Sequence, residues 1–78
     1  MEIEMYKYYE AEVNVKNKET LKPDANIADG QKVKVTIGWL IEEGAFKGQF
    51  AFLQHHGYWI PQEDLRIVRE ISYEEYKL

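Results

Sequence analysis

Apolar and polar residues alternate with a period of two along two long stretches of this chain, and this pattern constrains the fold more than any other feature. Residues 2–16 carry mostly apolar side chains at odd positions and mostly polar ones at even positions. Residues 31–42 repeat the pattern, with apolar residues at Val33, Val35, Ile37, Trp39 and Ile41. Because successive side chains of a strand point to opposite faces, both stretches predict half-buried strands. The first stretch exceeds the usual strand length of about five or six residues, so its first few residues are expected to fray or bend. Gly38, on the outer face of the second one, marks a bulge or a close approach of another backbone.

The second half of the chain predicts shorter strands separated by tight turns. Residues 49–54 are apolar on both faces, which is typical of a central strand or of a strongly bent strand in a barrel. A turn at 55–57 precedes the next strand, and Pro61 then opens a helical turn, since proline needs no amide donor at that position. The three strands are expected at 49–54, 58–60 and 65–69.

Length and local composition predict one domain with a loop and a packed tail. Seventy-eight residues supply a single core, so we expect one domain over 1–78 with its core at about 9–70 and a tail at 71–78. Residues 17–30 are rich in Pro, Asn, Asp and Gly, which favour an ordered loop. The Ser-x-x-Glu spacing that begins at Ser72 is that of a capping box, so the tail is expected to form a helical turn that packs on the barrel.

Composition also restricts the location and the partners of the protein. There is no cysteine, so neither a disulfide nor a thiolate zinc site can form, and a reducing compartment fits. No signal-peptide pattern is present, and no apolar run approaches the roughly 18 residues of a membrane span. We therefore expect a soluble, cytoplasmic protein with no membrane partner. The formal net charge of −4 disfavours a partner bound mainly through phosphates.

Residue types that support catalysis are few and badly placed. His55 and His56 are the only histidines, and as neighbours on a strand they point to opposite faces instead of sharing a metal. Ser72 is the only serine and lies in the tail, so no set of nucleophile, base and orienting group can be assembled. Glu63 and Asp64 suit the first turn of a helix, where the dipole favours acidic side chains. The sequence predicts no enzyme, no cofactor and no metal site.

Small motifs between residues 45 and 68 resemble the carboxy-terminal half of an SH3 domain. Ala45-Phe46-Lys47-Gly48-Gln49-Phe50 is similar to the family's Trp-Trp-Lys-Gly-Arg-like strand, and a hairpin turn follows it. The next motif, Gly57-Tyr58-Trp59-Ile60-Pro61, leads into a helical turn as it does in the family. Upstream, Asp29-Gly30 resembles the family's turn before its second strand, so the resemblance covers roughly residues 29–68.

The resemblance implies a fold more clearly than it implies a ligand. The implied fold is a small all-β SH3-like barrel of five to six antiparallel strands, with one short 3-10 turn at Pro61–Leu65 and a short C-terminal helical turn. In SH3 domains a proline-rich ligand lies in a groove lined by aromatic residues and a proline. Only Tyr9 and Pro61 of this groove carry over, because Ala45 replaces its tryptophan and Asp64 replaces a tyrosine. The stacking surface for a polyproline helix is therefore largely missing.

Aromatic side chains are the remaining candidates for a binding surface. Alternation assigns some of them, together with one aliphatic residue, to the core: Trp39, Phe50, Phe52 and Ile60. Exposed aromatic groups beside a long loop are a common composition of protein-binding patches. The candidate partner-binding residues are Tyr8, Tyr9, Phe46, Tyr58, Trp59 and Pro61.

These observations predict a non-enzymatic domain that binds a protein or peptide, and they leave two alternatives open. A small acidic domain of this kind is typical of bacterial and phage accessory proteins. One alternative is a homo-oligomeric or structural module that pairs through a strand edge. The other is a nucleic-acid-binding barrel that uses the Lys16–Lys34 region, although the net charge disfavours it. Its lysines are Lys16, Lys18, Lys22, Lys32 and Lys34.

Overall fold

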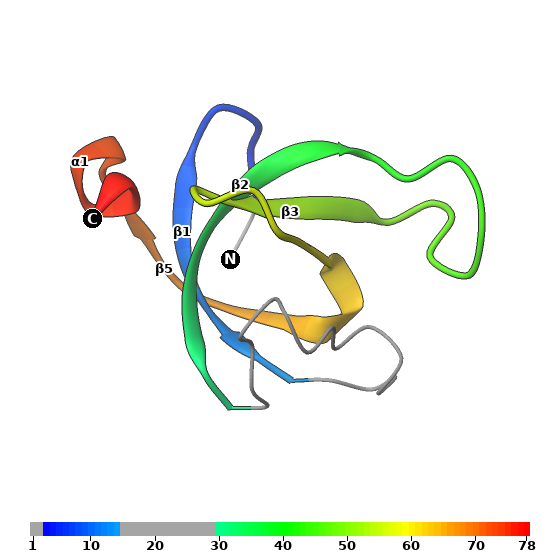
Figure 1. Cartoon of the computed structure of the whole chain (residues 1–78), viewed down its shortest axis with the longest axis horizontal. Coiled ribbons are helices and arrows are strands. Elements are labelled where there is room, and N and C mark those ends of the chain that lie inside the picture. The colour runs from blue at the N-terminus through cyan, green and yellow to red at the C-terminus, as the bar shows by residue number, and fades with distance from the viewer. Residues whose placement is uncertain (1–2, 15–29) are drawn as a thin grey trace.

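Five strands, a 3-10 turn and one short helix make up the computed structural model, which describes residues 3–14 and 30–78 (Figure 1). The strands are β1 (Tyr8–Val13), β2 (Lys32–Leu40), β3 (Phe50–Gln54), β4 (Trp59–Pro61) and β5 (Leu65–Ile71). The 3-10 turn η3 (Gln62–Asp64) precedes β5, and the helix α1 (Tyr73–Lys77) follows it. All strand pairs are antiparallel and belong to one sheet. The predicted antiparallel β fold, with a 3-10 turn before the last strand, is confirmed.

The two edge strands of the sheet follow each other directly in the sequence. The strand order is β4-β3-β2-β1-β5, and only η3 separates the end of β4 from the start of β5. The sheet is open, but it must curl until its edges approach each other at η3, and β2 bends visibly along its length (Figure 1). A 2.8 Å hydrogen bond from the Asn14 amide to the Asp64 carbonyl ties the end of β1 to this turn.

The inner face of the curled sheet carries the core, and the alternation of the sequence identified most of its members. Buried side chains come from β1, β2, β3 and β4, while Phe50 of β3 and two residues of β5 pack against them. The predicted inward positions of Phe52 and Ile60 are confirmed, since they are 1% and 5% exposed. The buried cluster consists of Tyr9, Ala11, Val13, Val33, Val35, Ile37, Phe52 and Ile60.

The expected bend in the first residues of the 2–16 stretch is confirmed. β1 begins only at Tyr8, because a turn with positive φ at Tyr6 (67°) interrupts the extended backbone. The chain folds back there, so Met5 is exposed instead of continuing the inner face, while Ile3 still packs against the core. The Glu4 amide donates a 2.8 Å hydrogen bond to the Tyr9 hydroxyl, which anchors the folded-back segment.

The predicted core position of Trp39 was wrong, because β2 contains a bulge. Ile37 pairs with Phe52, but Trp39 pairs with Ala51, so two steps along β2 match one step along β3. The extra residue rotates Trp39 to the outer face, where it is 43% exposed. Gly38 lies within the bulge, and a Cβ atom there would lie 3.3 Å from the Ala51 carbonyl oxygen. The sequence-based interpretation of Gly38 is therefore confirmed.

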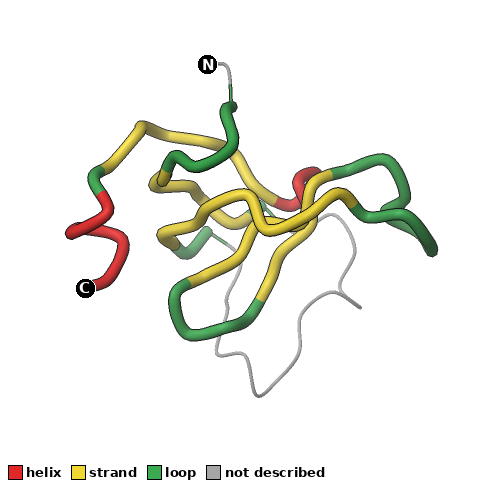
Figure 2. The backbone as a smooth tube through the Cα atoms, turned by 90° about the horizontal axis from the view of Figure 1, so that it is seen from above, coloured by secondary structure: helices red, strands yellow, loops and turns green. Residues whose placement is uncertain are grey.

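The tail packs against the sheet, as its capping box predicted. The Ser72 hydroxyl accepts a 3.2 Å hydrogen bond from the Glu75 amide and caps α1. Tyr76 is only 6% exposed, and its hydroxyl donates to the Leu53 carbonyl at 3.0 Å. Viewed from above, α1 and the loop between β2 and β3 lie at opposite ends of the molecule (Figure 2). Of the predicted loop at 17–30, all but Gly30 lies outside the described residues.

Candidate protein-binding surface

One row of side chains crosses the outer face of the sheet, and its exposure rises from β5 to β4. Because cross-strand partners project to the same face, the register defines this row. At its β5 end Ile71 is 7% exposed, whereas at its β4 end Trp59 is 39% exposed, and the three residues between them are partly buried. The outer row consists of Ile71, Tyr8, Thr36, Leu53 and Trp59.

At the β5 end the outer face is covered by α1. The Tyr8 ring lies 5.2 Å from the Tyr73 ring and 4.8 Å from the Tyr76 ring, measured between centroids. Burial raises the pKa of the Tyr76 hydroxyl, and the neighbouring phenols raise it further. The described residues thus include an aromatic cluster that holds the helix on the sheet.

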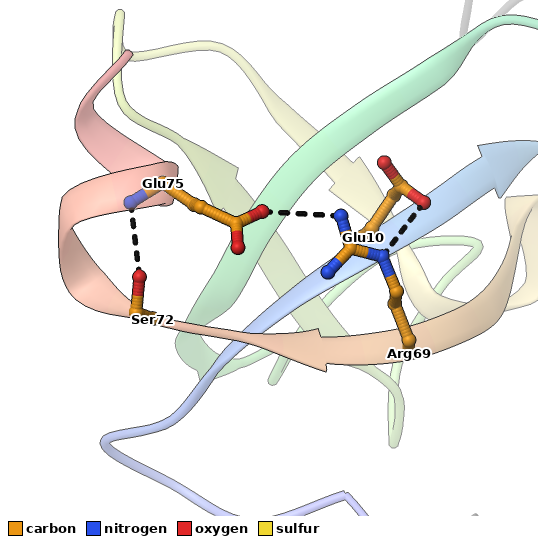
Figure 3. A network of polar contacts seen from close by, with 4 residues as sticks. All are labelled: Glu10, Arg69, Ser72 and Glu75. Atoms are coloured by element: carbon orange, nitrogen blue, oxygen red, sulfur yellow. Dashed lines mark hydrogen bonds and ion pairs between the residues drawn. The ribbon is translucent and has the colours of Figure 1, made fainter.

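Charged side chains connect α1 to the sheet at this end of the molecule (Figure 3). The Arg69 guanidinium lies between two carboxylates, at 3.1 Å from Glu75 Oε2 and 3.3 Å from Glu10 Oε1. The hydrogen bond to Glu75 is the main cause that raises the pKa of Arg69. All three groups are at least partly exposed, so their effect on stability is small and they mainly orient α1 over β1 and β5.

At the other end, two tryptophans cover the outer face of β3. The rings of Trp39 and Trp59 lie 5.7 Å apart between centroids and meet edge to face at 62°. By register Trp39 shares the outer face with Ala51 and Pro61, both of which are buried. The tryptophans therefore lie over a small apolar floor while 43% and 39% of their own surface remains exposed. We call Trp39 and Trp59 the tryptophan surface.

Acidic side chains lie close to the two tryptophans in the sequence. Glu42 and Glu43 follow β2 after one residue, Ile41, and are exposed. Glu63, in the turn after Pro61, is also exposed, and it is held by Gln49 of the β2–β3 loop. Its amide donates to Gln49 Oε1 at 2.9 Å, and Gln49 Nε2 donates to its carboxylate at 3.1 Å. Lys47 is the only cation among residues 41–49. The exposed charges that flank the two tryptophans in the sequence are therefore acidic on balance.

Of the predicted aromatic candidates, Trp59 is the one that the structure places on this surface. Tyr58 is partly buried, with its ring 5.4 Å from the His56 ring. Phe46 lies in the β2–β3 loop and is also partly buried. Tyr8 lies beneath α1. These three residues are therefore not gathered with Trp59 into one aromatic group.

The two residues that the family resemblance supplied are both buried, one in the core and one on the outer face. Tyr9 is 1% exposed and belongs to the core, and its hydroxyl accepts from the Glu4 amide. Pro61 is buried on the floor beneath the tryptophan surface. Neither side chain is accessible to a partner. Sequence reasoning instead missed Trp39 as a surface residue, and Gly38 was the signal that indicates the change of face.

Other candidate chemistry is not gathered into a site. Within residues 3–14 and 30–78 there is no group of three or more His, Cys, Asp or Glu that could hold a metal ion. His55 lies edge-on to Tyr76, whereas His56 lies edge-on to Tyr58, so the two imidazoles contact different rings. The part of the chain that the structure describes has no helix of the length and apolar character needed to cross a bilayer.

The lysine-rich region is only partly described. Lys16, Lys18 and Lys22 lie outside the described residues. Lys32 and Lys34 lie on β2, and their cross-strand partners on β1 are Glu12 and Glu10. Each of these two lysines therefore has an acidic neighbour on the outer face.

The tryptophan surface is thus the largest exposed aromatic feature of the described sheet. It combines a β scaffold with two contacting indole rings, and exposed glutamates flank these tryptophans in the sequence. Such a combination can bind an apolar and basic group by burial and by cation–π contact. Comparison with protein families, with curated proteins and with solved structures found no match to this chain.

Proposed function

We propose that this protein is a non-enzymatic binding domain and that its tryptophan surface binds a basic peptide segment of a partner protein. The observation that carries the proposal is the exposed edge-to-face pair of Trp39 and Trp59 on the outer face of the sheet. Tryptophan is among the residues that most often dominate the energy of protein interfaces. Exposed apolar residues gathered on one face are also a common feature of protein interaction sites.

The acidic residues that flank the tryptophans in the sequence suggest the class of peptide. Glu42, Glu43 and Glu63 attract lysine and arginine, and an arginine placed over an indole ring gains cation–π energy of about 0.5 to 2 kcal/mol. The negative net charge of the chain also attracts basic peptides over a longer range. The expected ligand is therefore a peptide in which an arginine or lysine stands next to an apolar residue.

Panning of a phage-displayed peptide library on the purified protein tests this proposal. The wild type is expected to enrich basic and apolar peptides, and the variant that combines Trp39→Ala with Trp59→Ala is expected to bind them at least about tenfold more weakly. Tyr6→Ala is the matched control, because Tyr6 is an aromatic residue with 89% exposure outside this surface. Equal binding by the tryptophan variant, or enrichment of acidic peptides by the wild type, would contradict the proposal.

We also infer that the sheet is a divergent SH3-like barrel. The order β4-β3-β2-β1-β5 and the position of η3 between the edge strands support this inference. The groove residues that carried over, Tyr9 and Pro61, are both buried, so the domain would use a different face from the family's usual groove. Inter-proton contacts across the gap between β4 and β5 in an NMR structure would support barrel closure, and a wide separation of these strands would exclude it.

A further inference from the structure

We propose that the basic peptide binds as an added strand, antiparallel to the free edge of β4, with an apolar residue opposite Trp59 and an arginine or lysine two positions before it. This binding mode rests on the proposed function and specifies how the peptide is held. β4 is an edge of the sheet, since its only neighbour in the strand order is β3. Extended peptides can add to such an edge, where main-chain hydrogen bonds hold them and side-chain contacts select them.

The hydrogen bonds between β3 and β4 leave the backbone of Trp59 facing outward. The Gln54 amide donates to the Tyr58 carbonyl at 2.9 Å, so the next residue of β4 whose backbone faces β3 is Ile60, two positions on. Trp59 lies between Tyr58 and Ile60, and its N–H and C=O therefore point away from β3. No backbone hydrogen bond from either group to another segment is found in the part of the chain that the structure describes. One outward-facing donor and acceptor pair is thus available to a partner.

Pro61 limits the length of the added strand and favours the antiparallel direction. It is the next outward-facing residue of β4 and has no N–H, so a full donor and acceptor pair is available only at Trp59. In an antiparallel ladder a single ligand residue exchanges both hydrogen bonds with Trp59. A proline on an edge strand also discourages continuous pairing with a second copy of that strand. The edge therefore suits one short peptide better than another copy of this chain.

The Trp59 ring is placed to contact the ligand residue opposite it. Cross-strand partners project to the same face, so this ligand residue would extend the outer row by one position beyond Trp59. Trp59 is 39% exposed, so its indole has free surface against which an apolar side chain can pack. The ligand would in this way contact the tryptophan surface with a side chain while its backbone pairs with the edge.

An exposed carboxylate lies farther along the same edge. Trp59 and Pro61 are paired with residues of β3 that are two positions apart. Glu63 continues this series opposite Gln49, and hydrogen bonds of 2.9 and 3.1 Å join the two residues. In an antiparallel ligand the residue two positions before the apolar one lies level with Pro61. A long basic side chain there can extend to the exposed Glu63, so the expected motif is an arginine or lysine, any residue, and then an apolar residue.

NMR titration with short peptides tests this pairing. Acetyl-Thr-Arg-Thr-Val-Thr-amide should bind at least about fivefold more tightly than acetyl-Thr-Val-Thr-Arg-Thr-amide, which has the same composition in the opposite order. Its binding should also slow the hydrogen exchange of the Trp59 amide. The N-methyl-valine form of the first peptide cannot donate to the Trp59 carbonyl and should bind about tenfold more weakly. Absence of binding by the first peptide, equal binding by all three, or an unprotected Trp59 amide in the complex would overturn the added strand.

Protein variants separate this binding mode from the proposed function. The variant that combines Trp39→Ala with Trp59→Ala should lose the peptide. Glu63→Gln removes the charge but keeps an oxygen acceptor for Gln49, and it should weaken binding of the first peptide about threefold. Glu74→Gln makes the same charge change in α1, at the β5 end of the outer row, and should leave the affinity unchanged. Equal weakening by the two glutamate variants would remove Glu63 from the site.

Two further outcomes decide between the levels of the proposal. If the tryptophan variant loses the peptide but N-methylation has no effect, the proposed function stands and the added strand is wrong. If the tryptophan variant binds as the wild type does, the proposed function is wrong. Protection of the Trp59 amide that rises with protein concentration in the absence of peptide would show that a second copy occupies the edge, and it would overturn the peptide as the occupant.

Discussion

The two ends of the outer row differ in what covers them. At the β5 end Ile71 and Tyr8 lie beneath α1, and the aromatic rings of Tyr73 and Tyr76 complete the packing. At the β4 end Trp59 meets only Trp39 among the aromatic rings of the described residues, and both remain substantially exposed. The same face of the same sheet is thus closed by the chain's own tail at one end and open at the other.

We interpret this difference as a division of the aromatic residues between stability and the proposed binding. The buried rings beneath α1 contribute to folding, since each aromatic side chain removes about 150 to 250 Å² from water. The tryptophan pair keeps much of its surface in solvent and so has that contribution still available to a partner. Substitutions at the closed end should therefore change stability strongly, and substitutions at the open end should change binding more than stability.

The largest effect is expected from Tyr76→Ala. This change removes a buried ring together with its hydrogen bond to the Leu53 carbonyl, and it should lower the free energy of unfolding by about 3 kcal/mol. Urea denaturation followed by circular dichroism measures it. Tyr73→Ala, at a ring that is 48% exposed on the same helix, should cost much less. An equal loss in the free energy of unfolding at the two positions would show that the buried Tyr76 ring is not what holds α1 on the sheet.

A smaller loss, about 2 kcal/mol, is expected from Gly38→Val. The new side chain would meet the Ala51 carbonyl oxygen at 3.3 Å and the Leu53 Cβ at 3.4 Å, so the bulge must shift and carry Trp39 with it. Urea denaturation gives the stability, and quenching of tryptophan fluorescence by acrylamide reports the altered exposure. Leu40→Val, at a residue of the same strand that is 51% exposed, is the control. A variant as stable as the wild type, with unchanged quenching, would contradict the role given to Gly38.

The sequence predicted the inner face of the sheet well, because alternation is a local property. Val33, Val35 and Ile37 are buried as the period of two requires. Trp39 broke the pattern because a bulge adds one residue to a strand, and counting positions cannot show which residue is the added one. Gly38 indicated a bulge or a close backbone contact at this point of the strand, but it did not indicate that the Trp39 ring lies on the outer face.

The candidate binding surface was less predictable than the fold for a related reason. Tyr9 and Pro61 were chosen through the SH3 resemblance, yet burial depends on what lies across the sheet, which a linear motif does not contain. The pairing of Trp39 with Trp59 joins residues twenty positions apart across a third strand, β3. Likewise, Ser72 predicted a helix, but the register that sets Tyr8 next to Ile71 decided where the helix would pack.

Removal of the helix cap should have an effect of about 1 kcal/mol. In Ser72→Ala the Glu75 amide loses the hydroxyl that accepts its hydrogen bond, so the single turn of α1 frays more easily. Amide hydrogen exchange of Glu75 and Tyr76 should become faster, while exchange in β3 should not change. Ser72→Asp keeps an acceptor at the cap and should preserve the protection. Equal loss of protection in both variants would mean that the cap does not hold the helix.

A smaller change is expected at alkaline pH. The pKa of Tyr76 is raised from its ordinary value of 10.0, so the neutral phenol is favoured in the folded state. This contribution to stability is complete below the unfolded pKa of about 10 and is lost as the pH rises through the folded pKa. Urea midpoints measured on both sides of this range should fall more for the wild type than for Tyr76→Phe. An identical fall in the two proteins would show that Tyr76 is not the group responsible.

The smallest effect on stability is expected at the open end. A double-mutant cycle with Trp39→Ala and Trp59→Ala isolates the energy of the edge-to-face contact, for which we expect about 0.5 kcal/mol, because aromatic pairs contribute little beyond their burial and these rings are partly solvated. The same cycle measured on peptide affinity should give a larger coupling, since a bound peptide excludes water from both rings. If the coupling in stability equals or exceeds the coupling in binding, the tryptophan pair serves mainly to hold the outer face of the sheet together. The open end would then be a second structural closure made by two side chains instead of a helix.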